Sequence, residues 1–80
     1  MLTIKILGTG CPNCKRLEKE TRRVLEAMDV KAEVVKVNDM QEILAYDVFS
    51  TPGLVIEEHV VSSGQVPSQE TLRELIADAL

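Results

Sequence analysis

Two cysteines separated by two residues are the part of this sequence best suited to covalent chemistry. They stand in the run Cys11-Pro12-Asn13-Cys14, and the 80 residues hold no other cysteine. A pair at this spacing can exchange its own disulfide with that of a substrate, or present two thiolates to a soft metal ion. Because two cysteines are too few to staple a small fold, the pair needs a chemical explanation.

The neighbouring residues place the pair at the start of a helix. Residues 2–7 favour a strand, a glycine-rich turn ends it, and from Pro12 the apolar residues recur at helical spacing. Pro12 suits the first helical position, where its missing N–H is not needed. Cys11 then stands at the N-cap. Its sulfur can accept a hydrogen bond from a backbone N–H of the first turn, and the positive end of the helix dipole points toward it.

The two cysteines are therefore expected to differ in reactivity. The helix terminus favours the thiolate, so we expect the pKa of the Cys11 thiol to lie below that of a free cysteine and Cys11 to be exposed and nucleophilic. Cys14 lies three residues on along the same helix face and is expected to be more buried. The predicted reaction has two steps. Cys11 attacks a substrate disulfide, and Cys14 then releases the reduced substrate and leaves the Cys11–Cys14 disulfide.

Positive charge is concentrated in the residues that follow the pair. The stretch contains five cations, namely Lys15, Arg16, Lys19, Arg22 and Arg23. One interpretation is a solvated helix face; the other is that Lys15 and Arg16 help to hold a nearby thiolate. The whole chain has a net charge of −4 with one Phe, one Tyr and no Trp. An acidic chain with few aromatic residues is not expected to bind nucleic acid.

The length and composition of the chain indicate how many domains it forms and whether it is associated with a membrane. Eighty residues are expected to form one domain, residues 1–80. No apolar run approaches the ~20 residues that a membrane span needs, and the first residues lack the basic and apolar regions of a signal peptide. We therefore expect a cytoplasmic, reducing setting with no membrane association, and a monomer.

The remaining sequence predicts an α/β fold in the order βαβαββα. A helix from Pro12 to about Met28 is followed by a strand over 32–37 and by a short helix that starts at Asn38-Asp39 and ends near residue 46. Strands are predicted over 54–56 and 60–63, and a last helix has Ser68 as N-cap. The first βαβ unit implies a parallel pair with a right-handed crossover, and the last two strands a hairpin. A four-stranded mixed sheet flanked by three helices follows.

The motifs resemble those of the thioredoxin-like superfamily. Gly-x-Gly-Cys-Pro-x-Cys follows the first strand, and Ser50-Thr51-Pro52-Gly53 precedes the third. The chain is similar to the small, glutaredoxin-sized redox-active disulfide proteins of bacteria and archaea over nearly its whole length. From proline statistics alone Thr51-Pro52 would be a trans turn. The resemblance implies instead that this bond is cis and faces the cysteines, that the Thr51 backbone pairs with substrate, and that Pro52 keeps metal off the thiolates.

The resemblance also implies the partners of the reaction. These are a disulfide-bearing protein substrate and a reductase as electron donor, such as thioredoxin reductase. No cofactor is expected beyond the redox-active Cys11–Cys14 disulfide, with Gly10, Pro12 and Asn13 shaping the site. The chain departs from the family's patterns in two ways. The Trp-Cys-Gly-Pro-Cys loop is absent, and Gly64 stands alone where glutaredoxins carry a Gly-Gly pair, so a glutathione site is not expected.

Other functions remain open on the residues themselves. A small copper or mercury carrier also presents a CxxC motif after a first strand, but such carriers usually run βαββαβ and end on a strand. No metal site is expected here, because two cysteines and one distant histidine are an incomplete set for zinc. The third functional class, after an oxidoreductase and a metal carrier, is a redox-inert interaction module. It would not explain why the chain contains the cysteine pair.

Four further residues are assigned positions by their hydrophobicity. We expect Tyr46 and Phe49 to pack beneath the Thr51-Pro52 loop, with contact to substrate as the alternative for Phe49. Met28 and Met40 are expected in the core.

Overall fold

The computed structural model describes residues 2–80 and has the predicted order of elements. Met1, the first residue of the expected 1–80 domain, lies outside the described residues. The elements are β1 (Leu2–Leu7), α1 (Pro12–Ala27), β2 (Ala32–Val37), α2 (Met40–Ala45), β3 (Gly53–Ile56), β4 (His59–Ser63) and α3 (Gln69–Asp78). Each helix begins at a side-chain N-cap, and two of these are Asp39 and Ser68, as predicted. None of the helices in residues 2–80 is long and apolar enough to cross a membrane.

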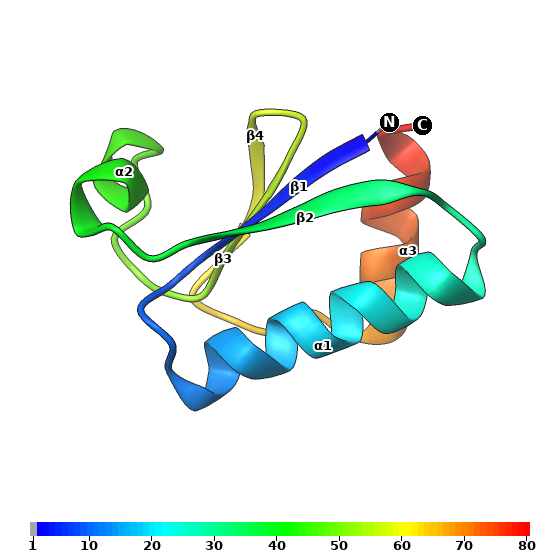
Figure 1. The fold of residues 1–80 in the computed structure, drawn as a ribbon, viewed down its shortest axis with the longest axis horizontal. Coiled ribbons are helices and arrows are strands. Elements are labelled where there is room, and N and C mark those ends of the chain that lie inside the picture. Colours follow the sequence, from blue (N-terminus) through cyan, green and yellow to red (C-terminus); the bar gives the residue numbers. More distant parts are fainter. Residues whose placement is uncertain (1) are drawn as a thin grey trace.

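The four strands form one mixed sheet in the order β2-β1-β3-β4. β1 is parallel to β2, while β1–β3 and β3–β4 are antiparallel pairs. Figure 1 shows α1 and α3 together on one side of the sheet, with α2 on the other side near one end. The predicted α/β fold, a four-stranded mixed sheet with three helices, is therefore confirmed.

Alternating side chains divide the core into two clusters, one on each face of the sheet. The larger cluster lies against α1 and α3 and includes Leu2, Ile4 and Ile6 of β1. The smaller cluster lies under α2 and includes Leu7 and Val55. Burial on both faces fixes the register of the central strands, because a slip of one residue would exchange the two faces.

The sheet register decides which loops meet. Leu7, the last residue of β1, pairs with Gly53, the first residue of β3, and Gly53 also pairs with Ser63, the last residue of β4. The loop that leaves β1, the loop that enters β3 and the loop that leaves β4 consequently emerge at the same end of the sheet. The cysteine motif lies in the first of these loops and Thr51-Pro52 in the second.

The expected burial of Met40 is wrong. Met40 is 55% exposed on α2 rather than in the core, whereas Met28 does pack against the larger cluster.

The start of β4 also differs from the prediction. Strand β4 begins at His59, one residue earlier than predicted, and the two-residue turn Glu57-Glu58 joins it to β3. Both glutamates have positive φ, 49° and 67°, as the favoured two-residue hairpin turn requires.

Tertiary contacts hold this turn in a conformation that glutamate rarely adopts. The backbone N–H of Glu57 donates to Thr3 O at 3.0 Å, and the Thr3 N–H donates to Glu57 Oε1 at 3.0 Å. Lys5 Nζ lies 2.8 Å from Glu58 Oε1 and donates to Tyr46 Oη at 2.7 Å. The Glu58 contact, followed by that with Tyr46, raises the pKa of Lys5 above its usual range. The hydrogen bond from Lys5 lowers the pKa of Glu58 below its usual 4.5.

Replacing Glu58 with Gln is expected to lower the free energy of unfolding at neutral pH. Because the folded-state pKa of Glu58 is depressed, its contribution is complete above the unfolded value of about 4.5 and is lost as pH falls through the folded value. Urea unfolding of both proteins between about pH 7 and pH 3 measures this difference, which should shrink on acidification. Glu33→Gln, an exposed change on β2, is the control. A difference that stays constant with pH would contradict the ion pair's role.

Candidate functional site

Three loops converge at the end of the sheet where β1 finishes. They are residues 8–11 before α1, residues 49–52 before β3, and the turn after β4 that contains Gly64. One main-chain hydrogen bond fixes the first loop to β2, and another joins the third loop to the second. Gly8 N–H donates to Val37 O at 2.9 Å, and Gly64 N–H donates to Pro52 O at 2.9 Å. The framework is therefore set by backbone contacts, not by the side chains at its rim.

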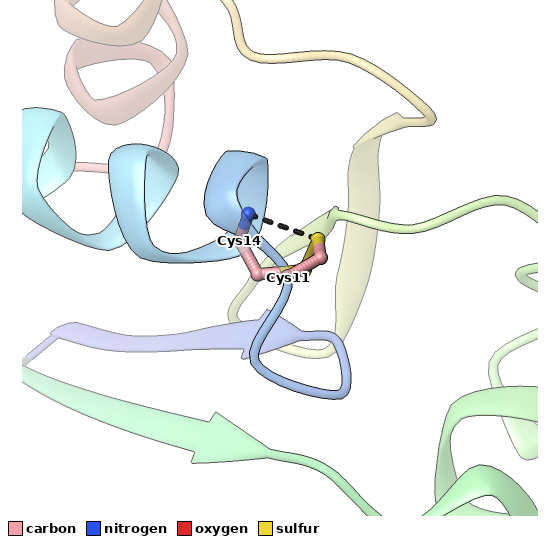
Figure 2. Close-up of a disulfide and its surroundings, with 2 residues drawn as sticks. All are labelled: Cys11 and Cys14. Atoms are coloured by element: carbon pink, nitrogen blue, oxygen red, sulfur yellow. Dashed lines mark hydrogen bonds between the residues drawn. A yellow bond between two sulfur atoms is a disulfide. The ribbon is translucent and has the colours of Figure 1, made fainter.

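The cysteines occupy the predicted positions at the start of α1. Cys11 is the N-cap, Pro12 is the first helical residue, and the Cys14 N–H donates to Cys11 Sγ at 3.2 Å (Figure 2). The two sulfurs form a disulfide, with Cα atoms 5.1 Å apart. Cys14 is 6% exposed, whereas Cys11 is half-buried and thus less open than the sequence predicted. Pro12 and Asn13 are exposed beside the disulfide. A substrate consequently meets Cys11 first.

Gly8 makes the closest approach to the disulfide, and sequence analysis did not identify it. A Cβ built on Gly8 would overlap Cys14 Sγ and come within 3.1 Å of Cys14 Cβ. The same position lies 3.9 Å from Thr51 Cβ, so the first two loops meet here. Glycine is required because the buried sulfur fills the space that any side chain would need. The signal in the sequence is a glycine placed directly between a strand and the cysteine loop.

Gly10 serves a different purpose in the same loop. Its φ is +88°, and no atom lies within 4 Å of where its Cβ would be. The residue is exposed and directly precedes Cys11. Glycine is favoured at this position by backbone conformation alone, because other residues rarely adopt positive φ. The two glycines therefore shape the loop for separate reasons, one steric and one conformational.

The loop before β3 brings Thr51 close to Gly8, the residue that lies against Cys14 Sγ, and Pro52 follows Thr51 directly. Their peptide bond is cis, as the resemblance implied and contrary to the trans turn expected from proline statistics. Pro52 is buried and Thr51 is exposed. Gly64 adopts a φ of +75°, and a Cβ there would come within 3.0 Å of Ser50 Cβ. The third loop therefore packs closely against the second one.

Phe49 differs most from its predicted environment. Its side chain is 83% exposed, so it does not pack beneath the Thr51-Pro52 loop. Tyr46 is partly buried and packs against the smaller core cluster. Val48 occupies the buried position of this segment, with its Cγ1 3.2 Å from where a Gly53 Cβ would be. Phe49 is left as an aromatic side chain in solvent, two residues before Thr51.

The charges on α1 are unevenly neutralised. Glu18 pairs with Arg22 at 3.1 Å and with Lys36 at 3.5 Å, and Glu20 pairs with Arg23 at 3.7 Å. Glu20 also accepts a hydrogen bond from Gln69. Within residues 2–80 no ion pair reaches Lys15, Arg16 or Lys19. The segment of α1 next to the disulfide therefore carries uncompensated positive charge.

Possible metal ligands do not gather elsewhere. In the part of the chain that the structure describes, no three side chains of His, Cys, Asp or Glu are grouped to hold a metal ion. Cys11 and Cys14 are joined to each other in the disulfide. This cysteine pair supplies one disulfide that can open and close.

Comparisons with known proteins give one consistent result. A thioredoxin domain family matches residues 2–77. A thioredoxin from Methanocaldococcus jannaschii is 39% identical over 74 residues, which are 92% of this chain and 85% of the relative. A thioredoxin from Methanothermobacter thermautotrophicus is 34% identical over 77 residues, which are 96% of this chain and 100% of the relative.

Solved structures share the fold at low sequence identity. Thioredoxin-2 of the malaria parasite has a TM-score of 0.74 and 14% identity, and the match covers 98% of this chain and 82% of that one. The germline-specific thioredoxin Deadhead of Drosophila melanogaster has a TM-score of 0.70 and 21% identity, with 99% and 81% covered. Sequence identities this low show only that the fold is shared.

Proposed function

Because the chain belongs to the thioredoxin family and is a thiol–disulfide oxidoreductase, we propose that it reduces disulfides in protein substrates through Cys11 and Cys14. Thioredoxins generally act on disulfide-bearing proteins and are reduced in turn by a reductase. The family match does not favour the alternative function, a soft-metal carrier. The observation that carries the proposal is the half-buried N-cap Cys11 in front of the buried Cys14.

The reaction follows from the different environments of the two sulfurs. In the reduced protein, the Cys14 N–H and the helix dipole favour a thiolate at Cys11. This thiolate attacks one sulfur of a substrate disulfide, the substrate S–S bond breaks, and the departing sulfur leaves as a thiolate that takes up a proton. The substrate is then held through a mixed disulfide to Cys11.

Cys14 completes the reduction. Its thiol loses a proton and attacks Cys11 Sγ, which breaks the mixed disulfide and releases the second substrate sulfur as a thiol after protonation. Two electrons have passed from the protein to the substrate, and the Cys11–Cys14 disulfide remains. A reductase such as thioredoxin reductase returns the two electrons. The disulfide itself is the redox group, so the proposed reaction needs no further cofactor and is a step of electron transport.

A protein substrate is favoured over glutathione by the surface around the disulfide. Phe49 is exposed and lies in the same loop as Thr51, which is also exposed and whose backbone we propose as the docking place for an extended substrate segment. An aromatic side chain of this kind is a common anchor in protein interfaces. Gly64 is close-packed against Ser50 and has no second glycine beside it, unlike the Gly-Gly pair of glutaredoxins. We place the protein in the cytoplasm, acting as one domain over residues 1–80.

The proposal is tested by comparing reduction of insulin disulfides with reduction of glutathione disulfide. With thioredoxin reductase and NADPH as the electron source, the wild-type protein is expected to reduce insulin much faster than it reduces glutathione disulfide. Phe49→Ser should lower kcat/KM for insulin about three- to tenfold, because an anchoring contact of about 1 kcal/mol is lost. The same change should leave a small aromatic disulfide reagent unaffected.

Leu80→Ser is the matched control, because Leu80 is also a largely exposed apolar residue. It lies at the C-terminus, away from the start of α1 (Figure 1). Faster turnover of glutathione disulfide than of insulin would overturn the preference for protein substrates. Absence of any disulfide reduction would overturn the function itself.

A further inference from the structure

We infer that this site selects disulfides flanked by acidic residues, through a basic collar formed by Lys15, Arg16 and Lys19. The inference rests on the proposed function and adds a substrate class to it. All three side chains are exposed, and no ion pair among residues 2–80 neutralises them. The five cations of this stretch were open to two interpretations from sequence. The structure separates them into Arg22 and Arg23, which are paired, and the collar, which is not.

The collar lies beside the reactive sulfur. Lys15 is four residues after Cys11, and its backbone N–H donates to Cys11 O at 3.1 Å. Side chains four residues apart lie on the same side of a helix, and helical side chains lean toward the N-terminus. Lys15 is thereby directed back toward the N-cap where a substrate disulfide is attacked. Lys19 continues the same side of the helix by one turn.

Arg16 extends the collar around the helix, because consecutive helical residues are about 100° apart. It lines an open cavity of about 450 Å³ together with Val66, Pro67 and Gln69. Glu20 also lines this cavity, but it is engaged by Arg23 and Gln69. An acidic side chain of a docked substrate would therefore meet an arginine without an ion-pair partner. Arginine is well suited to this because its fork of donors matches a carboxylate.

The position of these charges is unfavourable for the helix itself. Cations near a helix N-terminus oppose the macrodipole, and α1 has no acidic residue in its first turn and no basic residue in its last. The first turns of α2 and α3 contain Glu42 and Glu70, as the dipole favours. Residues that destabilise a helix locally are expected to be kept beside a reactive group only where they serve its function. A substrate carboxylate supplies the missing negative charge.

The test uses two peptide disulfides that differ only in the residues flanking cysteine. Each is a symmetric disulfide dimer that carries the same self-quenching fluorophore on both halves. One peptide has glutamates and the other has lysines on both sides of the cysteine. The protein is reduced beforehand and desalted, and reduction of each peptide is followed in a single turnover. Each rate is divided by the rate with dithiothreitol, which removes the intrinsic difference between the two peptides.

The wild-type protein is expected to prefer the glutamate peptide by about tenfold at low ionic strength, since charge complementarity acts mainly on the association rate. The preference should fall toward unity in high salt, where the Debye length is only a few ångströms. The net charge of −4 would by itself favour the lysine peptide. A preference for the glutamate peptide would therefore reflect the local positive charge of the collar and not the net charge of the protein.

Lys15→Gln/Arg16→Gln is expected to reduce the preference at least fivefold. A change in the reactivity of Cys11 would alter both peptide rates together and leave their ratio unchanged. Lys31→Gln/Arg73→Gln alters net charge equally and also breaks no ion pair among the described residues. Lys31 lies beyond the far end of α1, a helix of 16 residues that is therefore about 24 Å long. This control should keep the wild-type preference.

Three results would decide against the collar. They are equal normalised rates for the two peptides, preference for the lysine peptide, or loss of the preference in the Lys31→Gln/Arg73→Gln control. Failure of the wild-type protein to reduce either peptide would instead contradict the proposed function.

Discussion

Cys11→Ser is expected to reduce disulfide turnover to the level of a protein-free blank, whereas Cys14→Ser should stop at a covalent complex with the substrate. The difference follows from burial. Cys11 is the half-buried N-cap and Cys14 is 6% exposed behind it, so only the first can reach a substrate sulfur. Without Cys14, nothing in the site attacks the mixed disulfide, and the intermediate accumulates.

Non-reducing gels and intact mass measurement detect this complex after incubation with a disulfide substrate. With a symmetric substrate disulfide, the mass should equal that of the variant plus one substrate thiol less two hydrogens, and dithiothreitol should reverse the adduct. The double variant Cys11→Ser/Cys14→Ser is the control for non-specific association. Trapping by Cys11→Ser but not by Cys14→Ser would reverse the assigned roles, and trapping by neither would remove the two-step mechanism.

Gly8→Ala is expected to have the largest effect of any substitution that leaves both cysteines in place. The new methyl group would overlap Cys14 Sγ and crowd Cys14 Cβ at 3.1 Å. Overpacking of a buried position costs about 1–3 kcal/mol, a large share of the stability of so small a domain. Because the atoms that must move include the resolving sulfur, turnover should fall together with the free energy of unfolding.

A double-mutant cycle identifies the cause. Cys14→Ala removes the sulfur with which the methyl group collides, so Gly8→Ala should destabilise this background less than it destabilises the wild-type protein, both in the reduced form. Gly10→Ala is the comparison, because its Cβ meets open space and only its φ of +88° opposes the change. The cost of Gly10→Ala should be the same with and without Cys14 Sγ. An equal cost of Gly8→Ala in both backgrounds would exclude the collision.

The order of elements and the position of Cys11 could be predicted because each depends on local sequence. Strand alternation, helical spacing after Pro12, and the caps Asp39 and Ser68 all act within a few residues. The unequal burial of the two cysteines follows from the same local geometry, although Cys11 is less exposed than expected.

What could not be predicted depends on contacts between distant segments. The need for glycine at position 8 appears only when the helix folds back and places Cys14 Sγ against it. The Glu57-Glu58 turn contains neither glycine nor asparagine, so its sequence does not indicate a tight turn. Contacts from Thr3 and Lys5 of β1 hold it in its conformation instead. The hydrophobicity of Phe49 predicts a buried side chain, but apolar residues also occupy protein surfaces. An exposed aromatic side chain near a reactive group points to an interaction site.

The backbone framework of the site has a consequence for how such a protein can diversify. One main-chain bond, from Gly8 N–H to Val37 O, holds the first loop to β2, and another, from Gly64 N–H to Pro52 O, joins the third loop to the second. The side chains of Phe49, Lys15 and Arg16 take part in neither bond. Mutations at those three positions can therefore accumulate without dismantling the reaction centre. On the roles proposed for these side chains, a change in target preference need not alter the redox step, so a duplicated copy could acquire new substrates while its catalytic step stays intact.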